Sequence, residues 1–289
     1  MPAAIQDNPK PTRRIAIQGE CGSNSHMAAL AMLGDVEIVP CSASPEVFSA
    51  VVEHRADAAV LPIENSLHGS VAEHYDLLLQ HPVRIAGESL LRIRHNLIAA
   101  PGVSLEQIRT VLSHPVALSQ CRNWLANFPQ AKAVLFYDTA GSVKHIMAPQ
   151  PGDTPLRDTA GVAPTLAAKV YGANVLVAGI EDHAQNLTRF HLIQREADPL
   201  PASSAPPDKM SVAFALEHRP GTLVRALESL ATTGVDLTRI ESRPVPGRPW
   251  EYVFYVELRF TGEPMADRAL AALGPVCSMV KELGRYAAA

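Results

Sequence analysis

The stretch Arg13-Arg14-Ile15-Ala16-Ile17-Gln18-Gly19 opens the part of the chain whose pattern decides the fold. Its apolar middle predicts a short strand, and the small and polar residues 19–25 predict a loop. We expect a helix at 26–32 next, capped by Ser25. A second helix at 45–54 then leads to a strand at 58–63. Strand, loop, helix and strand in this order indicate a parallel sheet flanked by helices.

The same alternation continues as far as residue 195. The expected segments are strands at 90–99, 110–112, 133–137 and 188–194 and a helix at 116–128. We therefore expect residues 14–195 to form an α/β catalytic unit with a cleft between lobes. Residues 196–208 are rich in proline, serine and alanine, which offer too little large apolar surface to pack, and they predict a linker.

Residues 209–289 form a compact third block. Its first strand alternates between apolar and other residues, and the next helix carries leucines three and four positions apart. The expected elements after these are strands at 235–242 and 250–258, joined by a Pro/Gly turn, a helix from Pro264 and a strand near 276–281. The order β-α-β-β-α-β is that of a ferredoxin-like α+β domain.

The composition argues against several classes of protein. Of 289 residues, 47% are apolar and 19% charged, the net charge is −4, and no basic stripe is present. We therefore expect neither a nucleic acid nor a membrane surface as a partner. The four cysteines are widely spaced, which predicts neither a metal clamp nor a disulfide framework. Without a signal sequence or an apolar run of about 18 residues, the location is expected to be cytoplasmic.

Chemistry is expected in the loops, and the first candidate is Pro62-Ile63-Glu64-Asn65-Ser66. It follows a strand, at the edge where open parallel sheets bind ligands. Glu64, Asn65 and Ser66 supply an acid or base, an amide and a hydroxyl. The alternative is an ordinary polar turn that caps the next helix.

The second candidate is Ser113-His114-Pro115, which precedes a helix. A hydroxyl beside the free amides of a helix N-terminus can bind a carboxylate. The alternative is that Ser113 or His114 merely caps the helix. His114 predicts no metal site, because no second histidine follows four residues later and no CxxC pair is near.

The third candidate is Asn186-Leu187-Thr188-Arg189-Phe190. A guanidinium beside a hydroxyl suits an anionic substrate that loses a hydroxide. Strand alternation directs Thr188 and Arg189 to opposite faces, so Thr188 is the better candidate for the cleft, and a structural ion pair is the alternative for Arg189. The fourth candidate, Glu241-Ser242-Arg243-Pro244, also fits the polar tip of a hairpin.

These four loops occur together and in order, and from about residue 15 to residue 286 the chain resembles the prephenate dehydratase family. The matching stretches are 60–66 with Gly69-Ser70, Ser113-His114-Pro115 with Ala117-Leu118 and Cys121, and Ile180-Glu181-Asp182 with Asn186 and Thr188-Arg189-Phe190. The third block resembles the ACT regulatory domain of that family through Arg219-Pro220-Gly221, Leu237-Thr238, 240–244 and 247–252.

The resemblance implies a catalytic domain of two α/β lobes, similar to type II periplasmic binding proteins, with the substrate between them. It implies that this enzyme removes water and carbon dioxide from prephenate or from arogenate, with no metal and no cofactor. Thr188 is then essential and donates to the departing oxygen, while Ser113 positions a carboxylate and either Glu64 or His114 supplies a proton. The expected substrate-binding residues are Asn65, Ser66, Ser23, Asn186, Arg189 and Phe190.

The chain departs from the family in its opening loop, where Glu20 stands in place of a proline and Asn24 in place of an aromatic residue. Arogenate carries an ammonium where prephenate has a ketone, so an added carboxylate near the side-chain pocket can favour arogenate. Ser23 keeps a hydroxyl where the family commonly has threonine. The resemblance leaves the choice between the two substrates open.

For regulation, the resemblance implies phenylalanine bound between two ACT domains and hence a homodimer or homotetramer. The residues expected at that site are Gly221, Thr222, Leu223, Val224, Asp236, Leu237, Glu241, Ser242, Arg243 and Pro244. Two other classes of protein fit the fold pattern. One is a pure binding protein, against which the missing signal peptide counts. The other is a non-catalytic amino-acid sensor, against which the intact Thr188-Arg189-Phe190 counts.

Overall fold

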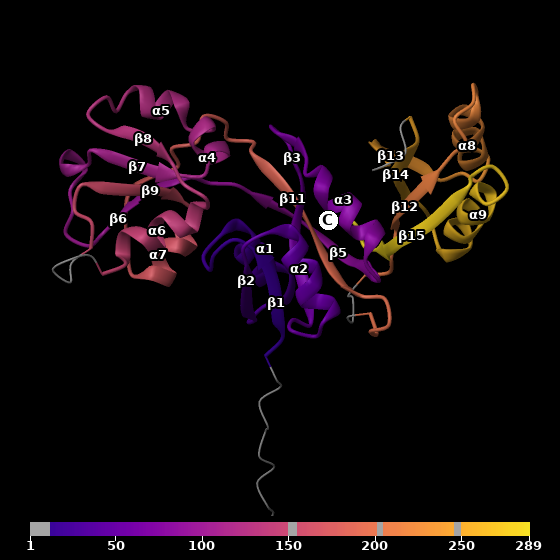
Figure 1. Ribbon diagram of the computed structural model, residues 1–289, viewed down its shortest axis with the longest axis horizontal. Coiled ribbons are helices and arrows are strands. Elements are labelled where there is room, and N and C mark those ends of the chain that lie inside the picture. Colours follow the sequence, from indigo (N-terminus) through magenta and orange to yellow (C-terminus); the bar gives the residue numbers. More distant parts are fainter. Residues whose placement is uncertain (1–11, 150–154, 201–204, 246–249) are drawn as a thin grey trace, which may run out of the picture.

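The computed structural model describes residues 12–149, 155–200, 205–245 and 250–289. Three sheets lie in a row, with lobe 1 in the middle, lobe 2 on one side of it and a C-terminal unit on the other (Figure 1). The chain passes from lobe 1 to lobe 2 and returns, so lobe 1 is built from two segments far apart in sequence, whereas lobe 2 is one continuous segment. The expected two-lobed α/β architecture with an added α+β unit is confirmed.

Lobe 1 is a mixed sheet with the strand order β2-β1-β3-β11-β5, and a short strand, β4, pairs with β3. Its strands are β1 (Arg14–Gln18), β2 (Glu37–Cys41), β3 (Ala58–Asn65), β4 (Gly69–Ser70), β5 (Val83–Arg92) and β11 (Leu187–Arg195). Its helices are α1 (Asn24–Leu33), α2 (Ser44–Val52) and α3 (Ala72–Gln80). The strands β1, β2 and β3 are parallel, whereas β11 runs antiparallel to β3 and β5.

The start of α1 corrects one prediction. Ser23, not Ser25, is the N-cap, because its hydroxyl accepts a hydrogen bond from the backbone N–H of His26 at 3.4 Å. Ser25 lies inside the first turn and is buried. The helix ends at Gly34, whose φ of 76° is a left-handed value that glycine adopts without strain.

Lobe 2 is a five-stranded sheet with the strand order β10-β6-β9-β7-β8. Its strands are β6 (Asn96–Ala99), β7 (Thr110–Ser113), β8 (Lys132–Leu135), β9 (Thr159–Ala163) and β10 (Asn174–Ala178). Its helices are η1 (Leu105–Gln107), α4 (Pro115–Ser119), α5 (Arg122–Ala126), α6 (Thr139–Met147) and α7 (Thr165–Tyr171). Lobe 2 packs its own apolar core around Leu97, Val111 and Val162.

Two further predictions are wrong about where elements end. The single strand expected at 90–99 is two strands, because β5 pairs with β11 in lobe 1 and β6 pairs with β9 in lobe 2. Residues 93–95 between them are the first passage from lobe to lobe. The helix expected at 116–128 is divided into α4 and α5 at Cys121, whose ψ of 23° interrupts the helix. The strands β2, β4, β9 and β10 were not predicted.

The C-terminal unit has the predicted order β-α-β-β-α-β, and its sheet order is β13-β14-β12-β15. Its elements are β12 (Lys209–Ala215), α8 (Thr222–Ala231), β13 (Asp236–Pro244), β14 (Tyr252–Arg259), α9 (Glu263–Leu273) and β15 (Met279–Tyr286). The last strand therefore continues five residues beyond the predicted end at 281. The Pro/Gly turn expected between β13 and β14, and residues 201–204 of the expected linker, lie outside the described residues.

Both faces of this C-terminal sheet are covered. Val212 and Phe214 pack under α8 and α9, whereas Ala213 between them packs against the core of lobe 1. Figure 1 shows the two helices on the side away from lobe 1. At Gly284 the strand β15 lies so close to β5 that a β-carbon would collide with the Ile85 carbonyl. The sheet that is expected to regulate the enzyme is thus packed directly on the sheet that carries the cleft.

Candidate active site

A cleft of about 740 Å³ lies between the two lobes. Lobe 1 lines it with the loop after β1, the end of β3 and the β3–β4 hairpin, and lobe 2 lines it with α4 and residues 137–144. Ile93 and His95, from the first passage between lobes, also line it, as does Thr188 at the start of β11. The cleft therefore contains the ends of segments that come together only when both lobes are folded.

Thr188 lies in the cleft with 7% of its surface exposed. Its hydroxyl oxygen accepts a hydrogen bond from Nδ2 of Asn65 at 2.9 Å. The amide of Asn65 is oriented by its neighbours, because Oδ1 accepts from the backbone N–H groups of Leu67 and His68 at 3.0 and 3.1 Å. Residues predicted from two separate loops are thus hydrogen-bonded to each other.

A chain of side-chain hydrogen bonds continues from Asn65 into lobe 2. Asn65 donates to Oδ1 of Asn186 at 2.8 Å, and Asn186 donates to Oε1 of Gln120 at 2.9 Å. The same oxygen of Gln120 lies 2.7 Å from Nε2 of His95, and its Nε2 lies 3.1 Å from Nδ1 of His68. Burial lowers the pKa of His95, which favours a neutral ring that donates from Nε2.

Three residues of this chain were missed by sequence reasoning. His68, His95 and Gln120 all line the cleft, and none stands in the quoted core of a candidate loop. His68 lies two residues after Ser66, and Gln120 lies between the quoted Ala117-Leu118 and Cys121, so the signal available was proximity to those loops. His95 lies within the single strand that the sequence predicts at 90–99, and a residue inside a strand gives no sign that it lies in a site.

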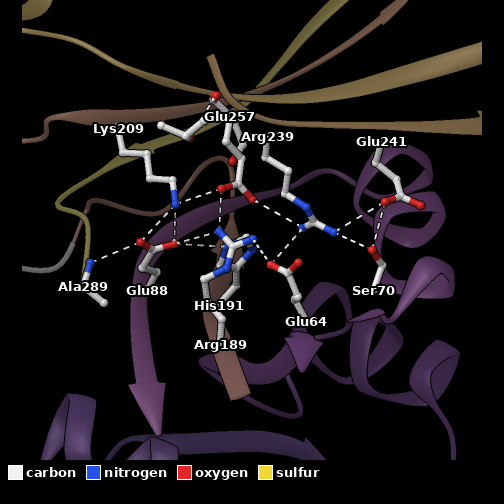
Figure 2. Close-up of polar contacts among 12 residues, drawn as sticks. Glu64, Ser70, Glu88, Arg189, His191, Lys209, Arg239, Glu241, Glu257 and Ala289 are labelled. Atoms are coloured by element: carbon white, nitrogen blue, oxygen red, sulfur yellow. Dashed lines mark hydrogen bonds and ion pairs between the residues drawn. The ribbon is translucent and has the colours of Figure 1, made fainter. Parts of the chain in front are cut away.

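Arg189 corrects a prediction. It does not line the cleft but points to the other face of β11, where it forms ion pairs with Glu64 at 2.9 Å and Glu257 at 2.5 Å (Figure 2). The physical reason is strand alternation, since Thr188 occupies the cleft face. The structural ion pair left open for Arg189 is therefore the one observed. Glu64 does line the cleft, and its carboxylate reaches Arg189 from there.

Ser113 and Ser66 also lie elsewhere than expected. Ser113 is fully buried and donates its hydroxyl to the carbonyl of Val162 at 2.6 Å, so it joins β7 to β9 and does not line the cleft. Ser66 accepts from the backbone N–H of Leu187 at 3.0 Å and donates to the carbonyl of Gln185 at 3.1 Å. Both hydroxyls hold backbone segments together, which removes them from direct contact with a ligand.

The other predicted residues are placed as follows. Ser23 and His114 line the cleft and cap α1 and α4, respectively, and Nδ1 of His114 accepts from the N–H of Val116 at 3.3 Å. Phe190 is a core residue with 1% of its surface exposed, although it forms part of the cleft wall. Asn186 is fully buried behind the wall and acts there through its hydrogen bonds.

Glu20 joins the two lobes at the cleft. Its carboxylate accepts hydrogen bonds from Lys144 at 2.8 Å and from the hydroxyl of Tyr137 at 2.9 Å, both from lobe 2. Burial and the hydrogen bond to Glu20 raise the pKa of Tyr137 to about 12, which keeps the phenol protonated. Gly19 permits this contact, since a β-carbon there would meet the carboxylate of Asp138 at 2.5 Å. Burial raises the pKa of Asp138 as well.

A second, smaller cavity of about 220 Å³ lies in the C-terminal unit. It contains the expected Gly221, Thr222, Leu223 and Val224, together with Trp250, Tyr252 and Phe254. The residues expected from β13 do not line it. Instead Glu241 accepts from the Ser70 hydroxyl at 2.9 Å and Arg243 pairs with Asp76 at 2.8 Å, so both contact lobe 1. Asp236 and Leu237 are exposed at the edge of the sheet.

Among the described residues, no group of three or more histidine, cysteine, aspartate or glutamate side chains is arranged to hold a metal ion. Nor does any helix in the described ranges have the length and apolarity to cross a membrane. The polar groups of the cleft are amides, hydroxyls, imidazoles, carboxylates and one lysine. Such groups can orient a small anionic substrate and exchange protons with it.

Residues 15–198 match the family model of prephenate dehydratase, which is well over half of the 289 residues. This chain belongs to the prephenate dehydratase family. The family predicted from the four loops is thereby confirmed, and with it the class of enzyme, a carbon–oxygen lyase. Prephenate dehydratases and arogenate dehydratases both occur among its relatives.

Arogenate dehydratase/prephenate dehydratase 2 of Arabidopsis thaliana is 40% identical over an alignment of 283 positions, which covers 94% of this chain and 72% of that protein. A prephenate dehydratase of Arthrobacter aurescens, solved in complex with L-Phe, has a TM-score of 0.82 at 31% identity and covers 95% of this chain and 89% of its own. GqqA, described as a novel type of quorum quenching acylase, has a TM-score of 0.83 at 33% identity over 96% and 98% of the two chains. Relatives of this prephenate dehydratase family member differ in their described activity.

Proposed function

We propose that this chain converts prephenate to phenylpyruvate by loss of water and carbon dioxide. The observation that carries the proposal is the Thr188 hydroxyl, which lies in the cleft with its oxygen accepting from Asn65. Because Asn65 donates to that oxygen, the hydroxyl keeps its own proton for a ligand. A donor held in this way can stabilise negative charge as it develops on a leaving oxygen.

The reaction needs little covalent help from the protein. The hydroxyl at C4 of the ring leaves as water while C1 loses its carboxylate, and the two electrons of the C–CO₂ bond complete the aromatic ring. Thr188 donates to the departing oxygen, and the remaining groups of the cleft orient the substrate. The ring carboxylate is best left weakly bound, because strong binding of it before the reaction would raise the barrier.

Glu64 and His114 remain the two candidates for the proton that completes the water. Glu64 lies next to Asn65, but its Oε2 is engaged by Arg189 at 2.9 Å. His114 uses Nδ1 as an acceptor for the N–H of Val116, so the proton of its neutral ring is on Nε2. That proton is available to the cleft, which favours His114 in this structure.

The side-chain carboxylate of the substrate needs a partner other than the predicted Ser113. Lys144 is the lysine of the cleft wall, and its side chain is half exposed. Ser23, Asn24 and Ser25 place the N-terminus of α1 in the wall of lobe 1, where free amides favour a carboxylate. We assign these two groups to the carboxylate.

The hydrogen bonds of the Glu20 carboxylate favour prephenate over arogenate as the substrate. The ammonium of arogenate would need a free carboxylate, and Glu20 was the sequence-based candidate for it. Its two oxygens are already engaged by Lys144 and Tyr137. The alternative, arogenate, is supported by the relatives whose names carry that activity.

The second part of the proposal is regulation by phenylalanine at the C-terminal unit. The 220 Å³ cavity beside Gly221 is lined by aromatic rings and lies at the N-terminus of α8. The edge strand β13 exposes Leu237 and Ile240. An exposed strand edge with apolar side chains suits pairing with a second copy, so we propose a homodimer or homotetramer through these domains.

The test is to measure phenylpyruvate formation from prephenate and phenylalanine formation from arogenate, each with and without added phenylalanine. Phenylpyruvate as the main product, with a rate that phenylalanine changes, supports the proposal. A clear preference for arogenate would replace the substrate and keep the chemistry. No product from either substrate with folded protein would overturn the enzyme proposal, and an acylase assay on the same preparation would then test the activity described for GqqA.

The proposed location is the cytoplasm, as the sequence predicts. The chloroplast is named for the Arabidopsis relative, and it is a property of that protein.

A further inference from the structure

An ion cluster that is buried except at Glu64, whose side chain is 38% exposed, joins lobe 1 to the C-terminal unit (Figure 2). Its six members, which we call the junction cluster, are Glu64, Glu88, Arg189, Lys209, Arg239 and Glu257. The three from lobe 1 carry a formal net charge of −1 and the three from the C-terminal unit carry +1. The two sides are therefore complementary, and the ion pairs between them hold the sheets in one arrangement.

The junction cluster is next to the proposed catalytic pair in both strands. In the pairing of β11 with β3, Thr188 stands opposite Asn65 and Arg189 stands opposite Glu64. Each residue of the Thr188–Asn65 hydrogen bond thus has a chain neighbour in the cluster. Because the backbone connects them directly, a change in the position of Glu64 also moves Asn65.

Arg239 is the member of the cluster that contacts the β3–β4 hairpin from the C-terminal unit. Its NH2 donates to the hydroxyl of Ser70 at 2.5 Å, and its NH1 lies 3.8 Å from Oε2 of Glu64. Ser70 and Glu64 stand opposite each other in the hairpin and both line the cleft. Arg239 therefore holds both strands of a hairpin that forms part of the cleft wall.

The strand that carries Arg239 is paired with the strand that lines the 220 Å³ cavity. Ser242 and Pro244 of β13 stand opposite Phe254 and Tyr252 of β14, and both of these rings line that cavity.

Glu241, two residues after Arg239 in β13, accepts from the same Ser70 hydroxyl at 2.9 Å and lies 3.5 Å from NH2 of Arg239. The guanidinium of Arg239 is stacked 4.9 Å from the ring centroid of Tyr75 in lobe 1. A shift of β13 along the sheet would thus change the hydrogen bonds of Ser70 directly, because both partners of its hydroxyl belong to β13.

The contacts of Arg239 leave room for a second arrangement. Its NH1 lies 3.6 Å from Oε1 of Glu257 and 3.8 Å from Glu64, and neither distance is a hydrogen bond. Both NH1 of Arg239 and Oε1 of Glu257 are buried without a hydrogen-bond partner in the described structure. Arg189 is different, because it bonds Glu64 at 2.9 Å and Glu257 at 2.5 Å. A small displacement would give Arg239 a full hydrogen bond to one carboxylate or to the other.

We propose that Arg239 is a positioning residue that couples phenylalanine binding in the C-terminal unit to the cleft, by changing its hold on Glu64 and Ser70. This inference rests on the proposed regulation by phenylalanine. Two arrangements of one buried side chain, each favoured by a different position of β13, form the kind of two-state element that carries coupling between sites. When the hold on Glu64 changes, Asn65 moves with it, and Asn65 in turn positions the Thr188 hydroxyl in the cleft.

The test compares Arg239→Met and Arg239→Lys with wild type, and Arg259→Met is the matched control. Arg259 lies in the same sheet and pairs with Asp208 at 3.1 Å, but both side chains are 43% exposed and neither belongs to the junction cluster. For each protein, kcat/KM is measured without and with saturating phenylalanine, and the Kd of phenylalanine is measured by calorimetry. The ratio of the two kcat/KM values is the response, for which a wild-type value of roughly 5- to 150-fold is typical.

The expected result is that Arg239→Met binds phenylalanine with a Kd within about threefold of wild type while its response falls to within about twofold of one. Arg239→Lys, which keeps the charge but has a single donor group, is expected to recover part of the response. Arg259→Met is expected to keep all of it. An unchanged response in Arg239→Met, with phenylalanine bound, would overturn the proposal.

A second measurement keeps the test decisive if Arg239→Met is too unstable to assay. Hydrogen exchange of residues 64–70 is followed in wild type and in Arg239→Lys, with and without phenylalanine. The expected result is a phenylalanine-dependent change in wild type that is smaller in Arg239→Lys, and equal changes in both would overturn the inference. If wild type itself forms product but does not respond to phenylalanine, the proposed regulation fails first, and this outcome is recognised before any variant is compared.

Discussion

Thr188 and Arg189 are neighbours in β11, yet the first lies in the cleft and the second in the junction cluster on the opposite face. Their partners in β3 are also neighbours, since Asn65 hydrogen-bonds Thr188 and Glu64, which itself lines the cleft, pairs with Arg189. One pair of residues in each strand thus connects the proposed chemistry with the contact to the C-terminal unit.

Removal of the Thr188 hydroxyl is expected to slow the chemical step. Thr188→Ala should lower kcat by on the order of 10²–10³-fold, by analogy with loss of one preorganised donor at a developing negative charge. Thr188→Ser keeps the hydroxyl and serves as the control, and it should retain most of the activity. Steady-state rates of phenylpyruvate formation give the measurement. Turnover of Thr188→Ala close to wild type would remove this residue from the mechanism.

Loss of Gln120 should disturb the catalytic pair from a distance. Gln120→Met leaves the amide of Asn186 and Nε2 of His95 without their acceptor, and a buried group left without a partner costs about 1–3 kcal/mol. We expect kcat/KM to fall by about 10- to 100-fold. Asn127→Ala is a matched control, because that side chain is exposed and bonds only the carbonyl of Asn123 among its described contacts. Equal kcat/KM in the two variants would exclude a role for the hydrogen-bond chain.

Lys144 is expected to act on substrate binding rather than on the chemical step. Lys144→Met should raise KM by about tenfold and leave kcat within a few-fold, because a half-exposed charge is partly screened by solvent. Glu20→Gln makes the opposite change, since it releases Lys144 for the substrate, and it should lower KM for prephenate. The two variants are compared by initial rates at low salt. A fall in kcat alone would contradict this assignment.

The junction cluster predicts loss of stability in acid. Burial by itself would raise the pKa of Glu88, but His191 and Lys209 outweigh it and hold that pKa below its ordinary value. For Glu257, burial also acts to raise the pKa, but the hydrogen bond and charge of Arg189 together with His191 and Lys209 outweigh it and lower that pKa. A carboxyl with a lowered folded-state pKa contributes stability above its unfolded pKa of about 4.3, and this stability is lost as the pH falls below that value.

Thermal unfolding between pH 7 and pH 3 measures this effect. The Tm is expected to be nearly constant down to about pH 5 and then to fall. Glu257→Gln should have a lower Tm at pH 7 and a shallower fall in acid, because one of the two carboxyls no longer titrates. A wild-type Tm that does not change between pH 5 and pH 3 would show that the cluster contributes no such stability.

Gly284 predicts how tightly the C-terminal sheet is packed on lobe 1. Its φ of 151° and the close Ile85 carbonyl leave no room for a β-carbon, so Gly284→Ala should lower the free energy of unfolding by about 1–3 kcal/mol. Gly274→Ala is the control, since its φ of −49° is helical and its nearest neighbour is 3.6 Å from the added carbon. Chemical denaturation measures both. Equal stability of the two variants would contradict the packing of β15 on β5.

Sequence alone determined those features that depend on local pattern and on the resemblance. The order of most strands and helices, the ferredoxin-like unit and the presence of Glu64, Asn65 and Thr188 in the cleft could be predicted from it, because alternation and loop chemistry are properties of neighbouring residues. The family was also identified in this way. Strand alternation also predicted that Thr188 and Arg189 point to opposite faces of the strand, and it gave an ion pair as the alternative for Arg189.

Only the tertiary structure decided which of these residues meet. The strand-like alternation expected over 90–99 includes Ile93, Arg94 and His95, so sequence could not show that the chain leaves one sheet there and enters another. Gln120 and His95 lie in the site because the two passages between the lobes bring distant segments of the chain together. Ser113 does not line the site, because its hydroxyl donates to the Val162 carbonyl on an adjacent strand. Hydrogen-bond partners far apart in the chain are chosen by packing, which no local pattern encodes.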